Sequence, residues 1–378
     1  MSTYIKAYLG TTPLFTAPSS AELIKNGLGT VTLSAANTYS GGTTINAGTL
    51  TTSIATGLGS GTVTVNGGAL TINYGAVAFA FTNNLTGNGT VNLTAANAGF
   101  ITVPVFRPIS MSGFNGTVTM DTGFNNIYYQ TNPNSGSTFD GSAAKWVVNN
   151  QNANSFVYTL ASLVKYGELS GNGKVSAANA NNTLEVGALG TNSTFSGILL
   201  NNNFGGTLAF TKVGSGTLTL SGNNTYTGAT TINAGTLEIT GGGRLGGGSY
   251  GGAITNNGTL IYSGNNDQTL SGVISGSGGL TKQGSGTLVL NGANTFTGAT
   301  AISAGLIRVA KAVGGITGTA TYSPTSLTVD FANVTPTSGA AYRFFPGSTA
   351  TTGLTISLTN AGGKTATYDY SNSTLTIV

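Results

Sequence analysis

One stretch of the sequence, from Thr211 to Leu237, constrains the fold more than any other because it occurs three times. It reads TKVGSGTLTLSGNNTYTGATTINAGTL, and related copies run from Ile24 to Leu50 and from Thr281 to Ile307. Each copy holds short runs in which apolar and polar residues alternate, separated by Gly and Asn. Alternation with a period of two, bounded by turn residues, predicts half-buried strands. Self-similarity of this kind predicts a repeat architecture.

The three copies agree position by position. Equivalent apolar residues of successive strands, such as Leu218 and Leu237, are separated by a plausible length for one coil of three short strands and three turns. Three sets of residues fall in register: Lys25, Lys212 and Lys282; Tyr39, Tyr226 and Phe296; Ile45, Ile232 and Ile302. From the phase of the alternation we expect a core that contains Leu218, Leu220, Ile232, Leu237 and Ile239.

The string G-S-G-T-L-T-L-S-G-x-N-T-Y-T-G-x-T-T-I-N-A-G-T-L resembles the autotransporter-associated β-strand repeat. This repeat is found in the passenger domains of autotransporters and in other large bacterial surface proteins. The three clear copies cover roughly a fifth of the chain. The resemblance implies an all-β fold, a right-handed parallel β-helix (solenoid) displayed outside a cell. It implies no particular activity, because no catalytic residue comes with the motif.

The composition fits a Gly-punctuated all-β chain. Only 6% of the 378 residues are charged, against about 25% in an average globular protein. Hydroxyl and amide side chains must therefore solvate most of the surface. Hydrophobic residues make up 39% of the chain, and their regular alternation argues for a narrow packed core and against disorder.

The charges exclude some classes of partner. The 13 basic and 9 acidic residues are scattered singly and leave a net charge of +4. Because nucleic-acid-binding proteins gather Lys and Arg on one face, we expect no nucleic-acid partner. No apolar run is long enough for a membrane helix, so we expect no membrane insertion. The first twenty residues lack the apolar core of a secretion signal.

We expect three regions in the chain. Residues 1–22 lack the repeat text and are interrupted by Pro13 and Pro18, so they form either an end cap or an extended arm that docks onto a larger assembly. Residues 23–313 form the β-helix, with wider, aromatic-rich coils at about 98–168. Residues 314–378 form a C-terminal β cap or a small β-sandwich, because a bare last coil would expose a sheet edge. The candidate contact residues of the arm are Tyr4, Ile5, Tyr8, Leu9, Leu14 and Phe15.

The residues available for chemistry are few. The chain has no His and no Cys, which excludes Ser-His-Asp triads, Cys nucleophiles and His-bearing zinc sites. We expect no catalytic residue, no metal site and no cofactor. Carboxylate pairs remain, since Asp121 with Asp140 and Glu168 with Glu185 are spaced by about one coil and would stack on adjacent rungs, as glycoside hydrolysis requires. The alternative, which we favour, is that these are scattered solvated acids.

Two features are open to both a structural and a binding interpretation. Asn37, Asn224 and Asn294 precede Thr and an aromatic residue in each copy, and Asn both tolerates left-handed turns and stacks between coils. We favour this structural role over a ligand-binding ladder. The bulky window at 98–168 is expected to fill the core of wider coils. The alternative is a glycan-binding or partner-binding surface formed by Tyr128, Tyr129 and Trp146.

We therefore predict a non-enzymatic structural or adhesive β-solenoid. The first interpretation is a bacteriophage virion protein, such as a tail fibre, head fibre or decoration protein, which presents a surface for host attachment or particle assembly. The alternative is a secreted bacterial surface adhesin similar to an autotransporter passenger, and a second alternative is a polysaccharide-degrading tailspike. Expected partners are other virion or surface-assembly proteins, further copies of the chain (a homo-oligomer such as a trimer) and a host surface glycan.

Overall fold

The computed structural model describes most of the chain. It covers residues 20–74, 79–95, 105–121, 127–129, 138–149, 156–159, 161–177, 181–201, 205–309, 320–322, 326–330, 341–343, 355–359, 362–369 and 374–378. The chain divides into two compact units, Met1–Leu189 with Asn202–Gly206 and Gly190–Asn201 with Thr207–Val378. Within the described ranges, the one helical element is a 3-10 turn, η1 (Gly246–Gly248). No helix in these ranges is long and apolar enough to cross a membrane.

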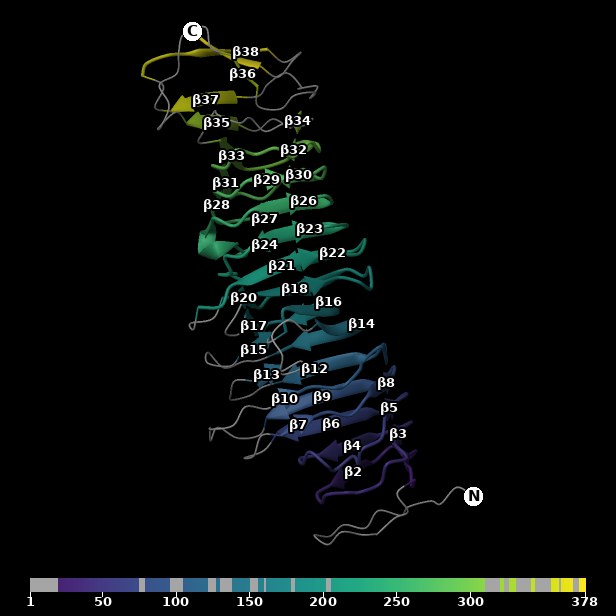
Figure 1. Ribbon diagram of the computed structural model, residues 1–378. Helices are drawn as coiled ribbons and strands as arrows, with labels where there is room; N and C mark the ends of the chain where they lie inside the picture. Colours follow the sequence, from purple (N-terminus) through teal and green to yellow (C-terminus); the bar gives the residue numbers. More distant parts are fainter. Residues whose placement is uncertain are drawn as a thin grey trace. The chain divides into compact units, whose positions relative to one another are not determined.

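Three parallel sheets build the first unit, and the chain visits them in turn (Figure 1). Strands β5, β6 and β7 belong to three different sheets, and β8, β9 and β10 then return to the same sheets in the same order. Each coil thus gives one strand to each sheet, which is the arrangement of a parallel β-solenoid. The first sheet holds β1 (Leu23–Lys25), β3 (Thr43–Ile45), β5 (Val63–Val65), β8 (Leu85–Gly87) and β11 (Gly113–Phe114). The second holds β2 (Thr30–Leu33), β4 (Thr49–Thr52), β6 (Ala69–Tyr74), β9 (Thr90–Ala95), β12 (Thr117–Asp121), β14 (Thr138–Val148), β16 (Leu163–Gly171) and β18 (Asn182–Val186). The third holds β7 (Ala80–Phe81), β10 (Val105–Phe106), β13 (Ile127–Tyr129), β15 (Val157–Thr159) and β17 (Lys174–Ala177).

The second unit repeats this parallel stacking and ends in a small antiparallel sheet. One ladder joins β19 (Ser193–Phe195), β22 (Thr217–Leu220), β24 (Thr236–Gly241), β27 (Thr259–Gly264), β30 (Gly279–Lys282), β32 (Thr300–Ile302) and β34 (Ala320–Tyr322). A second joins β21 (Leu208–Lys212), β23 (Thr230–Ile232), β26 (Ile254–Asn256) and β29 (Ile274–Ser275). A third joins β25 (Ser249–Tyr250), β28 (Gln268–Leu270), β31 (Thr287–Leu290), β33 (Leu306–Val309), β35 (Ser326–Asp330) and β37 (Thr355–Thr359). Strand β20 (Ile198–Leu200) follows β19, and the antiparallel sheet has the order β36 (Ala341–Arg343), β39 (Thr374–Ile377), β38 (Ala366–Asp369). The division of the chain at residues 22 and 313 stays a prediction.

The core lies on the inward phase of these strands, as the alternation predicts. In β22 the side chains of Leu218 and Leu220 are buried, while the intervening threonines are half-buried. All five residues expected in the core are buried. Leu218, Leu237, Leu260 and Leu280 pair in register and form one column of leucines across successive coils. Burial of each such side chain contributes about 1.5–3 kcal/mol, so the core of each coil stabilises its neighbours.

The Ala-Gly turn of each repeat, at Gly48, Gly235 and Gly305, requires glycine for two reasons. Gly48, Gly235 and Gly305 have φ values of 67°, 65° and 73°, in the left-handed region that side chains disfavour. A Cβ on Gly235 would also lie 2.5 Å from the carbonyl oxygen of Gly214. The turn therefore fixes both the backbone conformation and the close approach of neighbouring coils.

Coils in the aromatic-rich window are longer than those of the first repeat. In that repeat, Leu50 pairs with Leu70 on the next coil. In the aromatic-rich window the chain runs further before it returns to the same sheet, since Val91 pairs with Val118 and Val118 pairs with Trp146. The added length lies partly in the segment between β10 and β11 and partly in the long strand β14. These are the coils that carry the candidate site.

Aromatic side chains fill the core of these longer coils. The Trp146 ring stacks on Tyr166 with centroids 4.4 Å apart, and it meets Phe139 and Phe106 edge-on at 5.5 Å and 6.4 Å. Trp146 is fully buried, so its assignment to a binding surface is wrong, because core packing encloses the whole indole. The side chains of Tyr128 and Tyr129, in β13, lie outside the described residues, as do all six residues of the expected arm.

Candidate functional site

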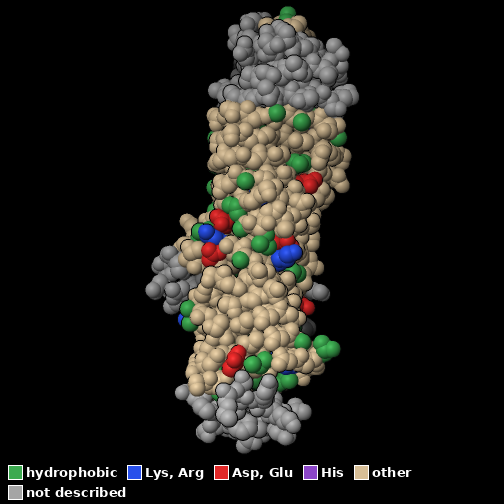
Figure 2. Space-filling view, turned by 90° about the vertical axis from the view of Figure 1, so that its right-hand side faces the viewer, with side chains coloured by type: hydrophobic (Ala, Val, Ile, Leu, Met, Phe, Trp, Pro, Cys, Tyr) green, Lys and Arg blue, Asp and Glu red, His purple; other side chains and the backbone are tan. Residues whose placement is uncertain are grey.

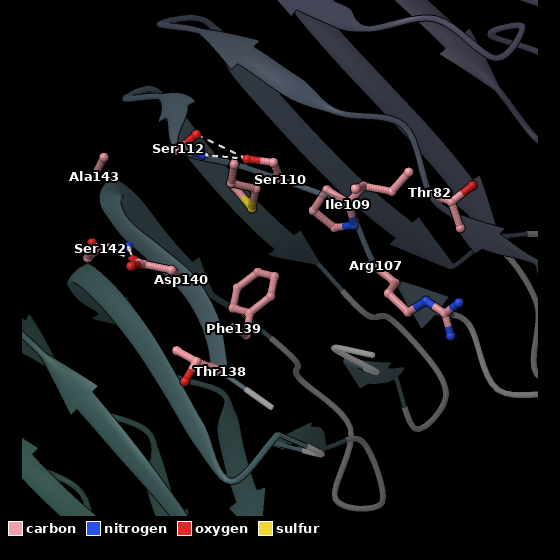
Figure 3. Close-up of a pocket in the computed structure, with 12 residues that line it drawn as sticks. Thr82, Arg107, Ile109, Ser110, Ser112, Thr138, Phe139, Asp140, Ser142 and Ala143 are labelled. Atoms are coloured by element: carbon pink, nitrogen blue, oxygen red, sulfur yellow. Dashed lines mark hydrogen bonds between the residues drawn. The ribbon is translucent and has the colours of Figure 1, made fainter. Parts of the chain in front are cut away.

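A cleft of about 590 Å³ opens on the first unit beside the aromatic cluster (Figure 3). Its walls come from the segment between β10 and β11 and from the beginning of β14. The lining residues are Thr82, Arg107, Pro108, Ile109, Ser110, Met111, Ser112, Thr138, Phe139, Asp140, Ser142 and Ala143. The volume lies in the range of small-ligand sites, about 300–1,000 Å³.

The cleft forms here because β14 departs from regular pairing. The register of β14 against β16 shifts between Gly141 and Lys145, which is the signature of a bulge. Trp146 holds the bulge in place, because its Nε1 donates a hydrogen bond of 2.9 Å to the carbonyl oxygen of Gly141. A Cβ at Gly141 would lie 2.4 Å from the indole ring. The buried aromatic cluster thus positions the residues at the start of β14 that face the cleft.

Two of the apolar side chains that line the cleft lie largely buried at its base and form its floor. Phe139 and Met111 line it but are 6% and 3% exposed, so only an edge of each reaches the opening. Ile109, at the rim, is 77% exposed. In Figure 3 the Phe139 ring lies between Arg107 on one side and Asp140 on the other. A ligand in the cleft would therefore meet an apolar surface with opposite charges on either side of it.

The polar groups of the cleft are ordered by hydrogen bonds. Asp140 Oδ1 accepts hydrogen bonds from the backbone N–H of Ser142 at 3.0 Å and from its hydroxyl at 2.5 Å. Burial raises the pKa of the Asp140 carboxyl, but the two bonds from Ser142 and the charge of Lys165 outweigh it and leave the pKa below its ordinary value. Across the cleft, the hydroxyls of Ser110 and Ser112 lie 3.0 Å apart. Asp140 is therefore an ionised acceptor at neutral pH.

The two glutamates considered for glycoside hydrolysis do not form a pair with each other, which agrees with the favoured interpretation of scattered acids. Glu168 lies 3.7 Å from the Nζ of Lys145, and Glu185 lies 3.7 Å from the Nζ of Lys165. The stacking of Glu168 on Glu185 is wrong, because β16 pairs with β18 through residues 163–166 only, which places Lys165 opposite Glu185. Lys165 is also in register with Asp140 on the preceding coil.

The pair of Asp121 with Asp140 is wrong for a similar reason. Asp121 ends β12 in register with Thr94 of β9, and the part of β14 that pairs with β12 begins at Lys145. Asp140 precedes the bulge and faces the cleft. Among the described residues, no group of three His, Cys, Asp or Glu side chains is placed to hold a metal ion.

The repeated asparagines bind neighbouring coils, as the structural interpretation predicts. Asn224 is fully buried, its Oδ1 accepts from the N–H of Leu199 at 2.9 Å, and its Nδ2 donates to the carbonyl oxygen of Gly222 at 2.9 Å. Asn294 accepts from the N–H of Ile274 at 2.8 Å, and Asn37 donates to the carbonyl oxygen of Gly57 at 2.7 Å. These side chains satisfy backbone groups at turns, and Asn224 and Asn294 are buried, as the structural role predicts.

Two comparisons with known proteins identify the repeats. The family model for the passenger-associated-transport-repeat matches residues 23–51, 210–239 and 280–309. The chain carries three passenger-associated transport repeats. They coincide with the copies found in the sequence, so the resemblance to autotransporter-associated repeats is confirmed. The chain is also 30% identical, over 295 residues, to the adhesin BmaC autotransporter of Brucella suis biovar 1 (strain 1330). That match covers 66% of this chain but spans only 8% of the length of the curated relative.

The comparisons bear on the choice between the interpretations of function. Both matches are to autotransporter proteins, and neither supports a virion protein. The alternative of a bacterial surface adhesin is thus better supported than the first interpretation.

Each passenger-associated repeat also contains a buried lysine that the alternation does not explain. Lys212 and Lys282 are 1% and 0% exposed. The Nζ of Lys282 donates to the carbonyl oxygens of Gln283 at 3.1 Å, Gly284 at 2.7 Å and Ala304 at 3.2 Å. Lys212 makes the equivalent bonds to Val213, Gly214 and Ala234. Burial lowers the pKa of Lys282 to about 8. In each case the ammonium joins a turn to the next coil, and Lys25 makes the same kind of contact with Ala47 at 3.0 Å.

The chain has few charged groups, since they make up 6% of its residues. Figure 2 shows a face that consists mostly of uncharged polar groups and backbone, with a few hydrophobic side chains and with charged side chains that adjoin near mid-height. The cleft of the first unit differs from this surface because it combines a guanidinium, a carboxylate and apolar groups. The sequence alone does not predict the cleft, although the loss of repeat text at 98–168 marks the coils in which it lies.

Proposed function

We propose that this chain is an adhesive β-solenoid segment of an autotransporter-type protein, displayed on the surface of a bacterium. The observation that carries the proposal is the set of three passenger-associated repeats, whose strands stack as parallel coils. The adhesin relative supports the adhesive role, although the shared region is a small part of that protein. The low charge of the exposed surface is compatible with contact to uncharged or weakly charged extracellular polymers.

We also propose that adhesion proceeds without catalysis. Glycoside hydrolysis generally needs two carboxyl groups within about 5–10 Å of each other. Among the residues that line the cleft, Asp140 is the single carboxylate. Glu168 and Glu185 are each held by a lysine and do not line the cleft. A cleft of this composition is suited to bind a ligand and not to cleave a glycosidic bond.

Surface display in a non-adherent bacterium tests the adhesive role. The chain would be fused to a heterologous autotransporter translocator, and surface exposure would be verified by protease treatment of intact cells. We expect the displaying cells to adhere to extracellular matrix or epithelial cells more than cells that display an unrelated β-solenoid of similar length. Equal adhesion of the two strains, at equal surface levels, would refute the proposal.

A further inference from the structure

We infer that the cleft of the first unit binds a carboxylate-bearing sugar, with Arg107 holding the carboxylate and Asp140 accepting hydrogen bonds from the sugar hydroxyls. The inference rests on the proposed adhesive function and deepens it, because it names the chemical class of the ligand. Three properties of the cleft lead to it. The guanidinium of Arg107 takes part in neither ion pair found among the described residues, and the carboxylate of Asp140 retains capacity to accept hydrogen bonds. The base of the cleft is apolar and is bordered by hydroxyl groups.

Arg107 is the first of these. It follows β10 directly, lines the cleft and is half-buried. The two ion pairs found among the described residues are made by Lys145 and Lys165, and neither involves Arg107. A guanidinium presents a planar fork of N–H donors that matches a carboxylate through two parallel hydrogen bonds. Since Arg107 lines a space large enough for a small molecule, we assign an anionic group of the ligand to it.

Asp140 supplies the complementary acceptor. Both hydrogen bonds from Ser142 go to Oδ1, and Oδ2 accepts none from a described residue. An ionised carboxylate has about four acceptor positions, so Asp140 retains capacity toward the cleft. A ligand that satisfies it must bring hydroxyl or N–H donors. A sugar acid carries several hydroxyl donors on the same ring as its carboxylate, whereas an acidic peptide has only backbone N–H groups to donate beside its carboxylate.

The remaining lining fits the same ligand. Thr82, Ser110, Ser112 and Thr138 place neutral hydroxyls on the walls, and each is able both to donate and to accept. The floor of Phe139 and Met111 offers apolar contact to the C–H face of a sugar ring. Among the described residues that line the cleft, Arg107 and Asp140 are the only charged side chains. This balance favours a ligand with one negative charge and many hydroxyls over a multiply charged polymer.

Isothermal titration of the full chain with defined sugars tests the inference. The probes are the methyl glycosides of glucuronic acid and of N-acetylneuraminic acid, with methyl glucoside as the neutral counterpart and N-acetyl-aspartyl amide as the peptide-like acid. We expect binding of at least one acidic sugar and no measurable binding of the neutral sugar or the aspartyl probe. Arg107→Gln should weaken binding roughly tenfold or more, since hydrogen bonds between charged groups contribute at least that much.

Three further variants sharpen the test. Arg107→Lys keeps the charge but loses the planar fork, so it should bind with intermediate affinity. Asp140→Asn should weaken binding of the acidic sugar even though it removes a negative charge, because the carboxylate acceptor is lost. Lys364→Gln removes one positive charge in the second unit and should bind like the wild-type chain. Fluorescence of the buried Trp146 checks that each variant retains the fold beside the cleft.

Several results would overturn the inference. These are absence of binding to both acidic sugars at the highest soluble concentration, equal binding of the neutral or aspartyl probe, and unchanged affinity in Arg107→Gln. Adhesion assays with cells that display the chain distinguish failure of this inference from failure of the proposed function. Sugar binding by the purified chain without cell adhesion would reject only the adhesive function. Adhesion of cells that display the wild-type chain, together with no sugar binding by the purified wild-type chain, would reject only the sugar site.

Discussion

The phenolic oxygen of Tyr226 lies 2.8 Å from the hydroxyl of Thr230, and the third repeat keeps the threonine but not the phenol. The first repeat has the same contact, between Tyr39 and Thr43 at 2.7 Å. In the third repeat Phe296 takes the place of the tyrosine, and the buried hydroxyl of Thr300 has no hydrogen-bond partner among the described residues. A buried hydroxyl without a partner costs about 1–3 kcal/mol. The same buried threonine hydroxyl therefore has a tyrosine partner in the first two repeats and lacks one in the third.

Phe296→Tyr should stabilise the third repeat by about 1 kcal/mol, because the new phenol can pair with Thr300. Tyr226→Phe should destabilise the second repeat by a similar amount, because it leaves Thr230 with one partner fewer. The measurement is the urea midpoint of each variant, followed by far-UV circular dichroism. A loss of stability in Phe296→Tyr would mean that the third repeat has no room for the hydroxyl, and the comparison of repeats would fail.

The strands of the repeats can be predicted from sequence because their signal is local. Alternation in residues 30–33 and 43–45, together with the flanking turn residues, predicts two strands, and the structure has them at Thr30–Leu33 and Thr43–Ile45. The cleft cannot be predicted in this way, because Arg107 and Asp140 line one cleft only through the added length of two coils and the bulge in β14. Asp140 lies opposite Lys165, and not beside Asp121, so the carboxylate pair considered as an alternative does not form.

The burial of the repeated lysines is a second feature that local sequence patterns do not predict. Lysine is almost never fully buried unless it is paired, so a lysine at the end of an alternating strand is expected to be exposed. Only the turn carbonyls that surround Lys212 and Lys282 explain the position. The one signal in the sequence is the recurrence of this lysine, in register, in all three copies.

Lys212→Met tests whether the ammonium stabilises the solenoid. Methionine keeps most of the aliphatic stem but leaves the carbonyl oxygens of Val213, Gly214 and Ala234 without the Nζ donor. We expect a loss of about 1.5–3 kcal/mol, the usual contribution of hydrogen bonds to a charged group. Lys364→Met, at a half-buried position near the C-terminal end, is the control. Unchanged or increased stability of Lys212→Met in urea titrations would show that desolvation of the charge outweighs its hydrogen bonds.

Ile232→Asp tests which side chains of β23 in the central repeat point into the core. Ile232 is 0% exposed, so an aspartate there would place a carboxylate without a partner in the core at a cost of several kcal/mol. The neighbouring Thr231 points to the other face of β23 and is half-buried. Thr231→Asp should therefore be tolerated with a much smaller loss of stability. Similar melting temperatures for the two variants would contradict the assigned phase.

Trp146→Ala tests the role of the indole as core and as support for the cleft. Removing a buried aromatic side chain typically costs about 3–5 kcal/mol, and here it also removes the hydrogen bond to Gly141. Trp146→Phe should cost less, because it keeps the ring contacts with Tyr166 and Phe139. Circular dichroism is the suitable probe, since Trp146 is the only tryptophan of the chain. A cost below about 1 kcal/mol for the alanine variant would contradict the packing seen here, since losses from core truncation are normally larger.

Strong alkali should unfold the chain through its buried tyrosines. Burial raises the pKa of Tyr39 and of Tyr250 from 10.0 to about 12, and that of Tyr226 is also well above the ordinary value. Between pH 10 and pH 12 the unfolded chain has already lost these phenolic protons while the folded chain keeps them. The free energy of unfolding must therefore fall as pH rises through this window, by about 1.4 kcal/mol per pH unit for each such group. Below pH 10 these groups contribute no pH dependence.

We expect phenolate absorbance from these side chains to appear together with the loss of the β-sheet circular dichroism signal. We expect Tyr250→Phe to move the unfolding transition to higher pH. Ionisation of all tyrosines near pH 10 with the circular dichroism spectrum unchanged would show that these phenols are not enclosed by the coils.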